Sequence, residues 1–124
     1  MQEKEGLEVA QVILPKGILE YFDFNGIKHT DTEIHIFLAE KNIPLEEYAH
    51  TKLTSKGFFD EVKVQDFPIR GKDVFLMIKR RRWLDESTGH GVYRDWEMVA
   101  KGTRMTGEFA AFLKAISRYK AGKL

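Results

Sequence analysis

Four consecutive cations stand in the second half of the chain, where Lys79, Arg80, Arg81 and Arg82 precede Trp83. Guanidinium and ammonium groups bind phosphate oxygens, and a guanidinium can do so through two parallel hydrogen bonds. An indole beside them can stack on a base or pack against an arginine. The run predicts contact with a polyanion, and the alternative is a solvated strand end whose charges keep an exposed edge soluble.

The charge of the chain is unevenly distributed along its length. The net charge is +1, but residues 1–62 carry −6 and residues 63–124 carry +7. An acidic first half and a basic second half predict one surface that faces a polyanion. The further candidates for nucleic-acid contact are Arg94, Lys101, Arg104, Lys114 and Arg118. The carboxylates that interrupt this basic half, some of which we expect to pair with arginines, are Asp85, Glu86, Asp95 and Glu97.

No pattern in the sequence predicts a catalytic or metal centre. The chain has no cysteine, which excludes disulfides, thiolate zinc sites and thiol catalysis. No two histidines share the i, i+4 spacing of metal ligands on a helix, and no glycine-rich phosphate loop leads into a helix. We therefore expect no enzymatic activity, no cofactor and no bound metal. The histidines are His29, His35, His50 and His90.

Length and composition predict one folded domain. The chain has 124 residues, of which 43% are hydrophobic and 31% charged, which is ordinary for a globular protein. We expect a single domain over residues 1–124 with an ordered core at about 7–119. No apolar stretch approaches the roughly 20 residues of a membrane span, and the first eight residues are acidic where a signal peptide is basic. Together with the missing cysteines, this favours the cytoplasm and no membrane partner.

The elements that must position the cations predict an α+β fold. A helical segment begins at Leu7 and is broken by Pro15 and Gly17. Residues 24–28 and 33–39 predict a hairpin, because residues 28–32 are polar enough to turn and Ile34, Ile36 and Leu38 alternate with His35, Phe37 and Ala39. Residues 44–50 predict a short helical turn and residues 52–57 a loop.

A three-stranded, ribbon-like meander follows at about residues 58–100. Its strands are expected at 59–67, 73–83 and 92–99, with turns at 68–71 and 85–91. The centre of the middle strand, VFLMI from Val74, is apolar on both faces and predicts a central strand or a strand at a packing seam. Thr106 is a candidate N-cap for a C-terminal amphipathic helix. The apolar stripe of that helix is Phe109, Phe112, Leu113 and Ile116.

Several strings in the second half together resemble the N-terminal region of bacterial insertion-sequence transposases. They are SKGFF from Ser55, VQDFPIRGKDVFL from Val64, KRRRW from Lys79 and KGTRMT from Lys101. The resemblance covers about residues 14–119, and it is to a group whose N-terminal region is encoded by a short separate reading frame upstream of the catalytic one.

The resemblance implies a non-catalytic module of a DNA transposition system. The corresponding stretch of related longer transposases is a zinc ribbon, but here residues 52–58 and 84–90, where its knuckles would fall, hold no cysteine. A metal-free ribbon is therefore implied. The implied partners are DNA, at the terminal inverted repeats of the element, and the separately encoded catalytic subunit. The alternative function is a protein interaction domain that docks on that subunit.

Overall fold

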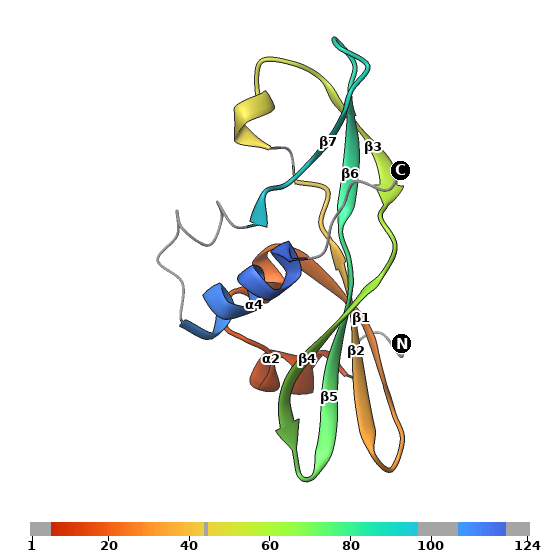
Figure 1. Cartoon of the computed structure of the whole chain (residues 1–124), viewed down its shortest axis with the longest axis vertical. Helices are drawn as coiled ribbons and strands as arrows, with labels where there is room; N and C mark the ends of the chain where they lie inside the picture. The colour runs from red at the N-terminus through yellow and green to blue at the C-terminus, as the bar shows by residue number, and fades with distance from the viewer. Residues whose placement is uncertain (1–5, 44, 97–106, 119–124) are drawn as a thin grey trace.

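The computed structural model describes residues 6–43, 45–96 and 107–118, and for residues 107–110 it describes the backbone alone. These residues form an α+β fold of two α-helices and seven strands in two sheets, which confirms the predicted fold class (Figure 1). No helix in these ranges is long and apolar enough to cross a membrane. In chain order the elements are α2 (Leu7–Ile13), η1 (Ile18–Glu20), β1 (Phe22–His29), β2 (Glu33–Glu40), η2 (Glu46–Tyr48), β3 (Leu53–Phe58), β4 (Val62–Ile69), β5 (Lys72–Lys79), β6 (Arg81–Asp85), β7 (Gly91–Tyr93) and α4 (Gly107–Ser117).

The two predicted helices and the break between the N-terminal pieces are present. Helix α2 ends at Ile13, and Leu14 is extended with φ −79° and ψ 154°, because a residue before proline is pushed out of the helical region. Gly17 has φ 100° and precedes the short helix η1. In α4 the predicted apolar stripe is buried at Phe112, Leu113 and Ile116. Thr106 and the side chain of Phe109 lie outside the described residues.

The first sheet has the strand order β1-β2-β5-β4. The predicted hairpin is confirmed as the antiparallel pair β1 and β2, and β4 and β5 form a second antiparallel pair. The two pairs join through β2 and β5, which run parallel in the register Ile36↔Leu76. Helices α2 and α4 pack on one face of this sheet. The buried residues of that packing are Ala10, Leu14, Ile18, Phe22, Ile36, Leu38, Val62, Val64, Val74, Leu76, Ile78, Trp96, Phe112, Leu113 and Ile116.

The second sheet has the order β3-β6-β7 and continues the first along one long ribbon. Strands β3 and β4 follow each other and pair with β6 and β5, so these four strands form what we call the long ribbon, residues 53–85 (Figure 1). The two halves meet where the Phe59 N–H donates to the Arg80 carbonyl at 2.9 Å. A second small core of Leu45, Trp83 and Val92 packs against the second sheet.

Three details of the predicted strands are wrong. Residues 52–57 are not a loop: β3 lies there and pairs with β6, with Gly57 taking φ 87° at an irregularity of the register. The strand predicted at 73–83 is two strands, because the chain leaves the first sheet at Arg80 and enters the second. The return strand ends at Tyr93, short of the predicted range, and residues 97–99 lie outside the described part.

Candidate nucleic-acid interface

The structure separates the members of the predicted basic run. Lys79 at the end of β5 is exposed, whereas Arg80 is only 7% exposed and its guanidinium lies 5.7 Å from the ring centroid of Phe59. Burial lowers the pKa of Arg80, although an arginine stays charged at neutral pH. Trp83 is 2% exposed, and its indole N–H donates to Asn42 Oδ1 at 2.9 Å. The buried Trp83 is thus part of the second core.

Two further arginines of the predicted site converge on a buried carboxylate, Glu40 at the end of β2. The Arg81 backbone N–H donates to Glu40 Oε1 at 2.9 Å, and its Nε donates to the Glu40 carbonyl at 3.1 Å. Arg94 Nε donates to Glu40 Oε2 at 3.0 Å, and another guanidinium nitrogen donates to the Ile43 carbonyl at 2.9 Å. The burial of Glu40 raises its pKa, while the hydrogen bonds from Arg81 and Arg94 oppose that rise. These contacts make Arg81 and Arg94 part of the junction between the sheets.

The exposed cations on or next to the long ribbon coincide with the predicted run only at Lys79. Lys52 just before β3, Lys56 in β3 and Lys79 at the end of β5 are exposed, and none has a carboxylate within 4.0 Å among the described residues. Lys63 and Arg70 are exposed farther along the ribbon. Arg82 is half-buried and its Nε donates to the Lys56 carbonyl at 3.1 Å. The loop predicted at residues 52–57 gave no reason to place Lys52 and Lys56 beside the basic run. Leu53 is followed by two polar residues, Thr54 and Ser55, so no alternation indicates the strand there.

The C-terminal cations of the predicted site belong to a separate element. Lys114 and Arg118 are exposed, four residues apart, at the end of α4, which packs against the first sheet. The i, i+4 spacing places them on one side of the helix. Lys101 and Arg104 lie outside the described residues.

A hydrogen-bond network closes the end of the long ribbon at β3 and β6. Asp85, which is buried, accepts the Thr51 hydroxyl at 3.0 Å and both the N–H and the hydroxyl of Ser87, at 2.9 and 2.7 Å. These hydrogen bonds, that of the Ser87 hydroxyl above all, lower the pKa of Asp85. The Glu86 N–H also donates to the Lys52 carbonyl at 3.1 Å. Segments 51–54 and 84–88 therefore lie side by side and are cross-linked without a metal.

No described side chains are grouped as metal ligands: within the described ranges there is no set of three His, Asp or Glu that could hold an ion. His35 Nε2 instead lies 2.7 Å from Glu33 Oε1, and this hydrogen bond lowers the pKa of Glu33.

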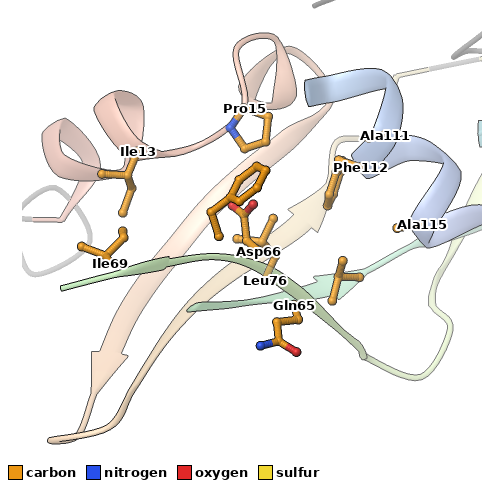
Figure 2. Close-up of a pocket in the computed structure, with 11 residues that line it drawn as sticks. Ile13, Pro15, Gln65, Asp66, Ile69, Leu76, Ala111, Phe112 and Ala115 are labelled. Atoms are coloured by element: carbon orange, nitrogen blue, oxygen red, sulfur yellow. The ribbon is translucent and has the colours of Figure 1, made fainter. Parts of the chain in front are cut away.

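An apolar groove of about 740 Å³ lies between the helices and the edge strand β4 (Figure 2). Its walls include Ile13 and Pro15 from the N-terminal segment and Phe112 from α4. Phe67 also lines it and is 74% exposed. A second hollow, of about 320 Å³, shares Ile13 and Ile69 with the groove, so the two adjoin. Val9 on α2 lines the second hollow and is 53% exposed. This edge of the first sheet therefore presents exposed apolar side chains.

Comparison with known proteins gives no relative: no family model, no curated protein and no solved structure matches this chain.

Proposed function

We propose that this chain is the non-catalytic, DNA-binding module of an insertion-sequence transposase, acting in the cytoplasm at the terminal inverted repeats of its element. The catalytic carboxylates then belong to a separately encoded subunit. The observation that carries the proposal is the meeting of segments 51–54 and 84–88 at one end of the long ribbon. They overlap residues 52–58 and 84–90, where the resemblance places the zinc knuckles of the longer transposases.

The closing of the ribbon end by two chain segments is what supports the resemblance. A zinc ribbon brings two knuckles together at the end of a strand pair, and its metal supplies much of the folding free energy. Here Leu53 is paired with Asp85, and the Asp85 carboxylate accepts hydrogen bonds from Thr51 and Ser87. Buried and multiply hydrogen-bonded, this carboxylate fixes the two segments in the place of a metal.

The exposed lysines of the long ribbon are the groups that we assign to phosphates. Lys52 precedes β3, Lys56 lies in β3 and Lys79 ends β5, and all three are exposed, while the half-buried Arg82 donates from Nε to the Lys56 carbonyl. The buried arginines contribute indirectly, because Arg81 and Arg94 hold the junction that keeps the two sheets in one ribbon. Phosphate contacts of this kind bind DNA without reading its bases.

Fluorescence anisotropy with a labelled duplex of the element's terminal repeat tests this function. The affinity is expected to fall steeply between about 50 and 200 mM salt, because bound lysines release counterions from the DNA. A scrambled duplex of equal length measures the sequence-independent part. Absence of binding to both duplexes at low salt would refute the proposed function.

A second candidate function, docking on the catalytic subunit, is favoured by the apolar groove. Phe67 lines the groove and Val9 lines the adjoining hollow, and both are large apolar side chains that stand mostly in water. A contiguous exposed apolar surface is typical of a protein interaction site. Pro68 in β4 is compatible with this edge position, because proline cannot donate to a neighbouring strand.

Calorimetric titration with the purified product of the downstream reading frame tests the docking. The paired substitution V9D/F67D is expected to weaken the affinity at least about tenfold, as loss of an interface anchor does. Gln11→Asp, an exposed polar position on the same helix, is the matched control and should leave the affinity unchanged. Equal affinities for V9D/F67D and the wild type would exclude the groove as the docking site.

A further inference from the structure

The first sheet has a second face, opposite to the helices, that carries aromatic rings and lysines. Partners in the strand register lie side by side on the same face, which assigns its residues to two rows across the strands. One row runs Lys28, His35, Phe75 and Gln65. The next runs Phe37, Met77 and Lys63. We call these seven residues the open face.

The rings of the open face are grouped at its centre. The His35 and Phe75 rings meet edge to face, with centroids 5.5 Å apart and planes at 75°, and Phe37 lies 6.5 Å from His35. The Phe37 and Phe75 rings are neither fully buried nor fully exposed. Side chains in this position, on the central strands of a sheet with helices behind it, offer flat surfaces on which unpaired bases stack.

Lysines lie over these rings. Lys63 Nζ lies 4.1 Å from the Phe75 centroid, and Lys28 Nζ lies 5.7 Å from that of Phe37. Stacking of a base on either ring requires the lysine above it to move aside, and a displaced lysine is long enough to contact a neighbouring phosphate. Rings and cations are therefore arranged as an unpaired nucleotide strand requires.

A hollow of about 230 Å³ adjoins Phe37. It is lined by Asn25, Lys28, Phe37, Leu38, Glu61 and Lys79. Because one water occupies about 30 Å³ of liquid, the hollow has room for a planar ring system. The Asn25 amide supplies a donor and an acceptor of the kind that pairs with base edges.

The charges of the open face favour binding of a polyanion across the middle of the sheet. Neither of the two rows contains a carboxylate, and each contains a lysine. The carboxylates lie outside the rows: Glu33 and Asp73 pair at one end and Asp23 opposes Ala39 towards the other, while Glu61 borders the hollow. Glu33 is also held by His35. A strand that crosses the middle rows meets two lysines, three rings, Met77 and Gln65, with the Glu33 carboxylate beside His35 at the border.

We propose that the open face binds single-stranded DNA, with bases stacked on Phe37 and Phe75 and phosphates held by Lys28 and Lys63. The proposal rests on the proposed DNA-binding function and adds to it a surface for an unpaired strand, which borders Lys79 at the hollow. Such strands arise wherever DNA is opened or cut.

Anisotropy titrations of the full chain with a labelled mixed-sequence single strand and with its duplex test this proposal. F37L/F75L keeps apolar volume but removes both stacking surfaces, and it is expected to weaken single-strand binding at least about tenfold. Duplex binding through the ribbon lysines should stay unchanged. K28Q/K63Q should reduce the salt slope of single-strand binding by about 1.4, from two lost phosphate contacts.

Phe67→Leu is the matched control, because Phe67 is an exposed aromatic that lines the groove on the helix side. It should leave single-strand binding unchanged, and Phe37→Trp, which enlarges the stacking surface, should strengthen it. Thermal unfolding verifies that each variant is folded. Duplex binding without single-strand binding, or single-strand binding that F37L/F75L and F37W both leave unchanged, would overturn this proposal alone. Binding to neither form would overturn the proposed function with it.

Discussion

Arg94 Nε lies 3.0 Å from Glu40 Oε2, and the two side chains are 12% and 1% exposed. Glu40 ends β2 in the first sheet, and Arg94 follows β7 in the second, so this pair joins the two sheets across 54 residues of sequence. The Arg81 N–H and Nε bind the same glutamate through its side chain and its carbonyl. Glu40 thus binds two of the arginines, Arg81 and Arg94, that the sequence suggested for DNA contact.

Replacing Glu40 by glutamine should change how stability depends on pH. Burial raises the pKa of Glu40 in the folded chain, so the folded state holds this proton more tightly than the unfolded state. Its stabilising contribution is complete below the ordinary glutamate pKa of about 4.3 and is lost as pH rises through the folded pKa. Urea unfolding at pH 4 and pH 7 should show Glu40→Gln gaining stability relative to the wild type as pH rises; the opposite trend would contradict the raised pKa.

Removing Arg94 should destabilise the chain strongly. In Arg94→Met the Glu40 carboxylate stays buried and loses its charged partner, which typically costs about 3 to 5 kcal/mol of unfolding free energy. Denaturant unfolding measures the loss. As a control, Arg118→Met, at an exposed position just after α4, should change the unfolding free energy by less than about 0.5 kcal/mol. The double variant E40Q/R94M should recover part of the loss; equal stabilities of R94M and the wild type would mean that the pair is not structural.

The sequence identified which residues carry charge but not where the charges would lie. Local patterns were sufficient for α2, α4 and the two hairpins, because turn residues and apolar spacing lie within each element. The parallel pairing of β2 with β5 links segments forty residues apart. The alternation around Ile36 or Leu76 predicts a strand but does not indicate which other strand it pairs with. Carboxylates near in sequence were the expected partners of the arginines, whereas Arg94 pairs with the distant Glu40.

The tight turn between β4 and β5 offers a stabilising substitution. Ile69 pairs with Lys72, and the two residues between them, Arg70 and Gly71, have φ 53° and 78°. Positive φ at both positions is typical of a type I′ turn, in which asparagine is favoured and most other side chains are strained. Arg70→Asn should therefore raise the unfolding free energy by about 0.5 to 1 kcal/mol in urea titrations. Gly71→Ala is the opposite test and should lower it.

Because hydrogen bonds to Asp85 hold the ribbon end together, the stability of the chain should fall in acid and should not change when a chelator is added. Hydrogen bonds lower the pKa of Asp85, so its stabilising contribution is present above the ordinary aspartate pKa of about 3.9 and is lost as pH falls through the folded value. Asp85→Asn should lower the melting temperature at pH 7 and narrow its difference from the wild type in strong acid. A fall in the wild-type melting temperature on adding EDTA would contradict a metal-free ribbon end.

The candidate site illustrates why exposure cannot be deduced from a basic run. A strand of four cations has no fixed face until its neighbours are known, and here the chain passes from one sheet to the other at Arg80. Arg80 and Trp83 are consequently buried, while Lys52 and Lys56 are brought beside the run from a segment that looked irregular. The hydrogen bond from Arg82 Nε to the Lys56 carbonyl shows that the two segments are in contact.

The salt dependence of duplex binding, compared between the wild type and K52Q/K56Q/K79Q, tests the central claim most directly. If these lysines hold phosphates along the long ribbon, the triple variant should bind more weakly and its slope of log K against log salt should be shallower by about 2 to 3. Its melting temperature should match that of the wild type, because all three side chains are exposed. An unchanged slope and affinity in the folded triple variant would contradict the assignment of the long ribbon to DNA.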